Sequence, residues 1–164
     1  MNNQKVTSKN YRTFALILLT IVYGFNFVDR QILGILAPFI QQDLGLTNTQ
    51  LGLLSGLLFA FFYTVVAIPI AWLADRYSRV NIVSIALATW SGFTALTGFA
   101  GNFMQIGLAR MGVGIGEAGG SPPSHSIISD MYPKEERAGA LGVYSMGIPF
   151  GIMAAYFVTA WIIG

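Results

Sequence analysis

Long apolar stretches, separated by short polar connectors, follow one another along almost the whole chain. They cover residues 11–40, 50–74, 80–100, 103–128 and 138–163. A bilayer core about 30 Å thick requires roughly 20 residues of helix, because other backbone arrangements leave polar groups unpaired in lipid. Each stretch reaches this length, so the pattern predicts five membrane-spanning helices. Residues 1–10 are predicted to form a polar, basic tail, and 11–164 to form one transmembrane domain.

The composition supports this interpretation and excludes several function classes. Apolar residues make up 54% of the chain and charged residues 10%, whereas an ordinary soluble domain has roughly 25% charged residues. Cysteine is absent and His125 is the single histidine, so neither a disulfide framework nor a thiolate or multi-histidine metal centre is expected. We therefore expect no cofactor. The net charge of +2 gives no indication of a nucleic-acid partner, and none is expected.

The basic residues predict the orientation in the membrane. With a cytoplasmic N-terminus, every basic residue at or beyond the ends of the apolar stretches falls on the cytoplasmic side. These residues are Lys5, Lys9, Arg12, Arg76, Arg79, Lys134 and Arg137. Short cytoplasmic loops carry an excess of Lys and Arg, so we expect the N-terminus to be cytoplasmic. A basic stretch before an apolar run is also typical of a signal peptide, but this run is too long and no A-x-A site follows it.

Four charged residues fall within the predicted spans: Asp29, Arg30, Arg110 and Glu117. A charge near the bilayer centre costs about 2.5–3.5 kcal/mol on insertion scales, so such residues are usually paired and often functional. At about 1.5 Å per residue, Asp29 and Arg110 reach a similar depth, and Glu117 lies two turns further along the helix of Arg110. We expect Asp29 to face Arg110, with Glu117 nearby in a polar cavity.

Arg30 follows Asp29 directly, so its side chain must point about 100° away around the helix. We expect it to contact an anionic group of a substrate or a segment outside this chain. The four charges have two interpretations. Either they form a structural ion-pair network, or Glu117 or Asp29 binds a proton or a substrate cation during a transport cycle. The second is favoured because an apolar cavity disfavours an ionised carboxylate, which suits proton coupling.

Gly112, Gly116 and Gly120 recur at intervals of four in the fourth apolar stretch. Small residues at this spacing allow two membrane helices to approach closely, and we expect the first span to be the partner. The same segment contains a G-x-G-x-x-G pattern. A dinucleotide site needs a preceding strand and an opening helix, whereas this pattern lies in the middle of a predicted span. Pro149 in the fifth stretch removes a backbone donor and is expected to bend that helix.

The connector at residues 71–80 reads AWLADRYSRV and resembles the G-x-L-a-D-r-x-G-r-k signature between the second and third helices of the major facilitator superfamily. It lacks two glycines and the last basic residue of that signature but keeps Asp75, Arg76 and Arg79. Within the spans, Asn26-Phe-Val-Asp29-Arg30 is similar to the N-x-x-D-R motif of Spinster-like transporters. Residues 110–118, RMGVGIGEA, are similar to the R-x-x-x-G-x-G-E-A motif of the same group.

This resemblance implies an all-α transmembrane helix bundle of the major facilitator superfamily type, here as a fragment of the N-terminal half with about five of twelve helices. It implies a secondary active transporter that works by alternating access on an amphipathic lipid-like or organic-anion substrate. Asp29 and Glu117 would take part in proton coupling, and Asn26, Arg30 and Arg110 would complete the substrate and proton pathway. The C-terminal half of the same protein would supply the opposite wall. The expected location is a bacterial plasma membrane.

The resemblance also implies a charge network at the cytoplasmic helix ends. Its members would be Asp75, Arg79, Asp130 and Arg137, which in the superfamily close the inner face in one state and separate in the other. A two-state protein needs contacts that exist in only one state. The alternative is that these charges only set the orientation in the membrane.

Two other function classes remain open from the residues alone. A membrane-embedded enzyme would need a metal cluster, or a nucleophile with its base, at membrane depth. A single histidine without cysteine disfavours this, so the chain is not expected to be an enzyme. A channel or a non-transporting membrane assembly subunit fits five spans, and a reading frame that ends at Gly164 would favour it.

Overall fold

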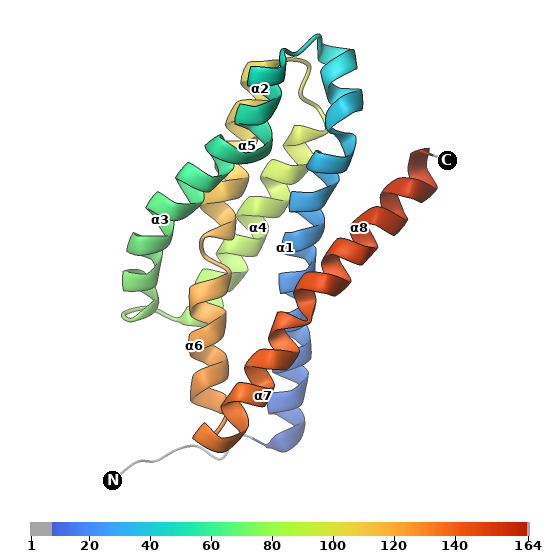
Figure 1. The fold of residues 1–164 in the computed structure, drawn as a ribbon. Helices are drawn as coiled ribbons and strands as arrows, with labels where there is room; N and C mark the ends of the chain where they lie inside the picture. Colours follow the sequence, from blue (N-terminus) through green and yellow to red (C-terminus); the bar gives the residue numbers. More distant parts are fainter. Residues whose placement is uncertain (1–7, 164) are drawn as a thin grey trace.

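The computed structural model describes residues 8–163, and within this range every regular element is a helix. The elements are α1 (Lys9–Leu44), α2 (Asn48–Gly52), the π-helical turn η1 (Leu53–Leu57), α3 (Leu58–Ala74), α4 (Arg79–Thr97), α5 (Phe103–Glu117), α6 (Ser121–Met131), α7 (Lys134–Ser145) and α8 (Gly147–Ile163). Figure 1 shows that they form one elongated helix bundle. The predicted all-α fold class is confirmed. Lys5 lies outside the described residues, and α1 already includes the last two residues of the predicted tail.

Short polar side chains begin four of the helices. Ser8, Thr47, Ser78 and Asn102 each accept a hydrogen bond from the backbone N–H three residues further on. This satisfies one of the donors that a helix start leaves free. At the other end of α1, Gly45 has a φ of 60°, in the left-handed region that favours glycine. These helix starts and this helix end lie in the polar segments between the apolar stretches.

Four helical runs are long and apolar enough to cross a membrane: Lys9–Leu44, Asn48–Ala74, Arg79–Thr97 and Lys134–Ile163. The predicted fourth span differs from one continuous helix. It consists of α5 and α6, with a break at residues 118–120. Pro122 and Pro123 follow the break, and since neither has a backbone N–H they cannot continue the hydrogen-bond ladder through it. Glu117 is therefore at the end of a helix.

The glycines of α5 allow it to pack closely against α4. A Cβ added at Gly116 would lie 2.6 Å from the backbone nitrogen of Trp90. A Cβ at Gly112 would lie closer still to the ring of Phe93, whereas one at Gly120, just beyond α5, would meet the Trp90 ring at an ordinary 3.5 Å. The expectation that the first span is the partner of this glycine face is therefore wrong. The spacing identifies a face that permits close packing, but it contains no information about which helix meets that face.

A second close contact occurs where α8 crosses α1 (Figure 1). A Cβ added at Gly147 would lie 2.7 Å from the carbonyl oxygen of Thr20. The regular hydrogen-bond pattern is interrupted at Met146, where α7 ends and α8 begins. Pro149 cannot donate to the carbonyl of Ser145, which explains why the helix is interrupted here. Met146 itself keeps helical dihedral angles, so the bend expected from Pro149 stays a prediction.

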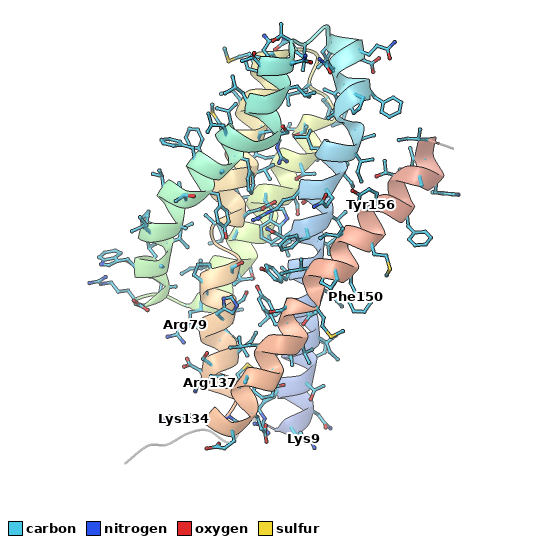
Figure 2. The ribbon with its side chains drawn as sticks, viewed as in Figure 1. Lys9, Arg79, Lys134, Arg137, Phe150 and Tyr156 are labelled. Atoms are coloured by element: carbon cyan, nitrogen blue, oxygen red, sulfur yellow. The ribbon has the colours of Figure 1, made fainter. Side chains whose placement is uncertain are left out.

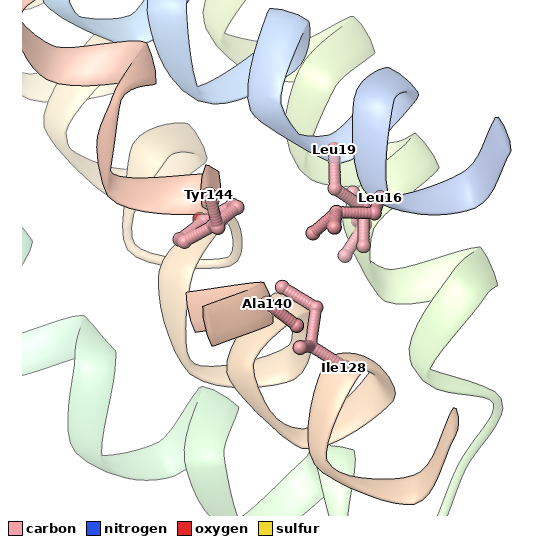
Figure 3. Packing of buried hydrophobic residues seen from close by; sticks show 6 residues of the cluster. Leu16, Leu19, Ile128, Ala140 and Tyr144 are labelled. Carbon is pink, nitrogen blue, oxygen red and sulfur yellow. The ribbon is translucent and has the colours of Figure 1, made fainter. Parts of the chain in front are cut away.

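A buried apolar cluster joins α1 to α6 and α7 (Figure 3). Leu16 and Leu19 of α1 pack with Ile128 of α6 and with Ala140 and Tyr144 of α7. In a membrane, helix association depends on such packing rather than on removing apolar surface from water. Many large apolar side chains elsewhere are exposed, as expected for a surface that meets lipid or another helix bundle.

The basic residues outside the predicted spans collect at one end of the bundle. Figure 2 shows Lys9, Arg79, Lys134 and Arg137 together at the end where α1 begins. The side chains of Arg12 and Glu136 lie 3.6 Å apart there and connect α1 with α7. This is the end that the charge pattern assigns to the cytoplasm.

Candidate functional site

An ion pair between Arg30 of α1 and Glu117 of α5 forms the centre of the candidate site. Arg30 Nε donates to Glu117 Oε2 at 2.7 Å, a short, charge-assisted hydrogen bond. The Glu117 side chain is 0% exposed and that of Arg30 is 28% exposed. The pair is thus enclosed on the carboxylate side and open on the guanidinium side. Arg30 was expected to contact an anionic group of a substrate or a segment outside this chain; its ion-pair partner among the described residues is Glu117, and the expected contact stays a prediction.

Three aromatic rings surround the Arg30 guanidinium. Its central carbon lies 5.3 Å from the ring centre of Phe27, 4.8 Å from that of Phe59 and 5.0 Å from that of Tyr63. Cation–π contacts of this kind contribute about 0.5–2 kcal/mol each. Phe59 and Tyr63 were not predicted as site residues. Their spacing of four, which places both on one helix face, is the only signal in the sequence, and it is common in apolar helices.

Asp29 and Arg110 line a common cavity between α1, α4 and α5, together with Thr94. Their similar depth brings them to one space, but no direct ion pair joins them in the described part of the chain. Arg110 is only 4% exposed, and its Nε and the Thr94 hydroxyl have no hydrogen-bond partner within residues 8–163. A lone threonine in an apolar stretch has no distinguishing signal, so Thr94 was not predicted.

Asn26 lies one turn before Arg30 on α1 and is 4% exposed. Its Oδ1 and the Oε1 of Glu117 both lack a hydrogen-bond partner among the residues that the structure describes. A buried acceptor without a partner costs about 1–3 kcal/mol, so a water or a ligand donor would be stabilised at either oxygen, and a proton only at the Glu117 carboxylate. The predicted pathway residues thus fall into two groups. Arg30 and Glu117 form one, Asp29 and Arg110 form the other, and Asn26 is buried on the same helix as Asp29 and Arg30.

At the basic end, the predicted charge network is only partly assembled. The Arg79 guanidinium of α4 pairs with the Asp130 carboxylate of α6. Arg137 donates to the carbonyl oxygen of Ser129 at 2.6 Å instead of to a carboxylate. Asp75 lines the same surface depression as Arg79 and Asp130, but it has no ion pair within residues 8–163. The pair of Arg79 and Asp130 is the core of this arrangement.

The described residues contain no group of three His, Cys, Asp or Glu side chains that could hold a metal ion. His125 packs against the ring of Tyr144, with 5.1 Å between the ring centres.

Comparison with known proteins agrees with the motifs and the fold. Residues 19–164 match the family model of the Major Facilitator Superfamily. The chain is 34% identical over 138 residues to an MFS-type efflux pump of Mycolicibacterium smegmatis, and 32% identical over 162 residues to a D-galactonate transporter of Escherichia coli. These alignments cover 84% and 99% of this chain, and 32% and 37% of the two relatives.

Solved structures give the same result. The fold matches the crystal structure of a bacterial homolog to the human lysosomal transporter Spinster, in an inward-facing and unoccupied conformation, with a TM-score of 0.85 and 45% sequence identity. The match covers 91% of this chain and 31% of that one. An occupied, inward-facing structure of such a homolog matches with the same TM-score and identity. The chain spans about a third of the length of these proteins. It belongs to the Major Facilitator Superfamily and, as its motifs indicated, is Spinster-like.

Proposed function

We propose that this chain forms part of a secondary active transporter that works by alternating access and couples substrate movement to protons. The ion pair of Arg30 and Glu117 is the observation that carries this proposal. One partner is enclosed and the other is partly exposed, so a ligand can reach the guanidinium without displacing α5. Family membership supports the proposal, because the relatives described above are transporters or efflux pumps.

The proposed coupling follows from the charges of the pair. While Glu117 is ionised, its carboxylate holds the Arg30 guanidinium. When Glu117 takes up a proton, the pair loses its ionic attraction, and Arg30 becomes available to an anion. By linkage, an anion bound to Arg30 promotes proton uptake at Glu117 to the same extent. Proton and anion would therefore bind together and be released together.

The proposed substrate is an organic anion with a carboxylate or phosphate group, amphipathic lipid-like anions included. A guanidinium binds both groups through paired hydrogen bonds. The rings of Phe27, Phe59 and Tyr63 next to Arg30 would contact the apolar part of such a molecule. Residues beyond this chain, as in the longer relatives, would supply the opposite wall of the binding site.

We also propose that the protein resides in a bacterial plasma membrane with its N-terminus in the cytoplasm. The gathering of Lys9, Arg79, Lys134 and Arg137 at one end (Figure 2) supports this orientation, because positive residues are retained on the cytoplasmic side. Asp43 and the connection between α4 and α5 then lie at the outer side.

Flux into liposomes that contain the full-length protein tests the transport proposal. We expect labelled D-galactonate or a labelled lysophospholipid to accumulate when a pH gradient is imposed, and a protonophore should remove the accumulation. Substrate flux that ignores the gradient would contradict the proton coupling alone. No flux of either compound, or of a wider panel of organic anions, would contradict the transporter proposal itself.

We propose that the pair of Arg79 and Asp130 closes the cytoplasmic side in one state. Its side chains are 30% and 66% exposed, and an exposed ion pair contributes at most about 1 kcal/mol to stability. Asp130→Asn should therefore shift Tm by only a few degrees but lower the transport rate several-fold, because the balance between the two states changes. Asp75→Asn is expected to lower the rate as well.

Thermal unfolding and initial flux rates check this prediction. Glu135→Gln is the matched control, since Glu135 is exposed on α7 and forms no ion pair in the described residues. An unchanged flux rate in Asp130→Asn would leave these charges with a role in membrane orientation only.

A further inference from the structure

A half-open cavity of about 360 Å³ lies between α1, α4 and α5, and neither Arg30 nor Glu117 is among its lining residues. Asp29, Thr94 and Arg110 are among its lining residues at one end, and Asp43, Leu44 and Ala100 at the other. Asp43 is exposed in the last turn of α1. Figure 1 shows the end of α1 and the connection between α4 and α5 at the same end of the bundle, away from the N-terminus. The cavity thus extends from buried charges to a polar surface.

The wall that α1 contributes is a single helix face. Its lining residues recur at intervals of three or four: Asp29, Leu33, Leu36, Ile40 and Asp43. Residues at this spacing lie above one another along a helix, and at about 1.5 Å per residue the stripe is about 21 Å long. On α4, Thr94 and Thr97 are also three residues apart and line the same cavity. Polar groups therefore occur at the surface, at intermediate depth and at the buried end.

Water in the cavity would satisfy unpaired atoms at its buried end. Thr94 Oγ1 and Arg110 Nε have no hydrogen-bond partner within residues 8–163, and buried polar atoms in native proteins are rarely left unsatisfied. At about 30 Å³ of liquid volume per molecule, a space of this size accommodates on the order of ten waters. The charged lining residues are Asp29, Asp43 and Arg110, whose formal charges sum to −1. This balance favours a cation over an organic anion.

The cavity does not include the ion-paired side of α1. Arg30 points away from Asp29 and bonds to Glu117, and neither residue lines the cavity. The ring of Phe59 lies against both guanidinium groups, 4.8 Å from that of Arg30 and 5.2 Å from that of Arg110. Among the groups that surround Asp29, α4 contributes Thr94 and no charged residue, while α5 contributes Arg110 and, two turns further, Glu117.

We propose that this cavity is a hydrated, cation-selective route along which protons from the outer surface reach Asp29 without passing the face that carries Arg30 and Glu117. The outer placement rests on the orientation proposed above. The two carboxylates would then exchange protons with separate compartments: Asp29 through the bundle, and Glu117 through the substrate-facing side.

Cysteine labelling of the full-length protein in right-side-out vesicles tests the route. This chain contains no cysteine. Thr97→Cys and Leu36→Cys therefore each place the single thiol of residues 1–164 at the cavity. We expect a membrane-impermeant, positively charged methanethiosulfonate to label both from outside about ten-fold faster than its negatively charged analogue, because a field of one sign in a narrow space raises counter-ion access. Asp43→Asn should slow the cationic labelling about three-fold for the same reason.

Leu96→Cys is the matched control, since Leu96 precedes Thr97 on α4 but is 56% exposed on another face. Neither charged reagent should label it from outside, and saturating substrate should leave the labelling of Thr97→Cys unchanged. The route would be overturned if neither charged reagent labelled position 36 or 97 in the folded protein, although the same thiols reacted after unfolding. Faster labelling by the anionic reagent, or protection by substrate, would also overturn it. Labelling as expected without gradient-driven flux would support the route and contradict only the transport proposal.

Discussion

Glu117→Gln in the full-length protein is expected to abolish substrate accumulation driven by a pH gradient. Glutamine keeps the size of the side chain and can still accept a hydrogen bond from Arg30 Nε, but it can neither exchange a proton nor hold the guanidinium by charge. Removing one partner of a fully buried ion pair costs about 3–5 kcal/mol. Because Arg30 is 28% exposed, the loss here should be smaller, although Tm should still fall.

The double variant Arg30→Gln/Glu117→Gln separates the two effects. With both charges of the pair removed, neither partner is left as an uncompensated charge, so Tm should recover relative to the single variant while gradient-driven accumulation stays lost. Glu135→Gln serves again as the control and should behave like the wild type in both measurements. If Glu117→Gln accumulated substrate normally under a pH gradient, the pair would have the structural role that the sequence also allowed.

Gly116→Val is expected to disrupt the packing of α5 against α4. The Cβ of the new valine would lie 2.6 Å from the backbone nitrogen of Trp90 and 2.9 Å from its Cβ. Trp90 is only 1% exposed, so the tryptophan has no space to move into. Overpacking of a tight core costs about 1–3 kcal/mol and occasionally more. Because Glu117 is the next residue, a displaced α5 should also weaken its pair with Arg30. Thermal unfolding and the yield of monodisperse protein measure the loss.

Gly92→Val is the matched control for this prediction. Gly92 lies on α4, two residues after Trp90, but nothing approaches within 4 Å of a Cβ added there. The same side-chain change should therefore shift Tm far less than at position 116. Similar losses in the two variants would attribute the effect to valine in a helix rather than to the contact between α5 and α4.

The helical elements, and the chemistry they contain, could largely be predicted from the sequence. Apolar stretches of sufficient length leave the backbone no alternative to helix in lipid, and Ser8, Thr47, Ser78 and Asn102 cap helices at the expected breaks. The break between α5 and α6 was missed although its signal was present. Two glycines followed by Pro122 and Pro123 interrupt the hydrogen-bond ladder, but an analysis of hydropathy alone passes over them.

Which charges meet was decided by the tertiary structure. The sequence by itself placed Asp29, Arg30, Arg110 and Glu117 at membrane depth, because their positions along the helices determine their depth. It could not determine which of them form an ion pair between α1 and α5. The expected partners were Asp29 and Arg110, whereas the observed pair is Arg30 and Glu117. That depends on the rotation of α1 relative to α5 and on the choice of α4 as the partner of the glycine face. Both follow from packing between helices far apart in the sequence, and helical periodicity determines directions only within a single helix.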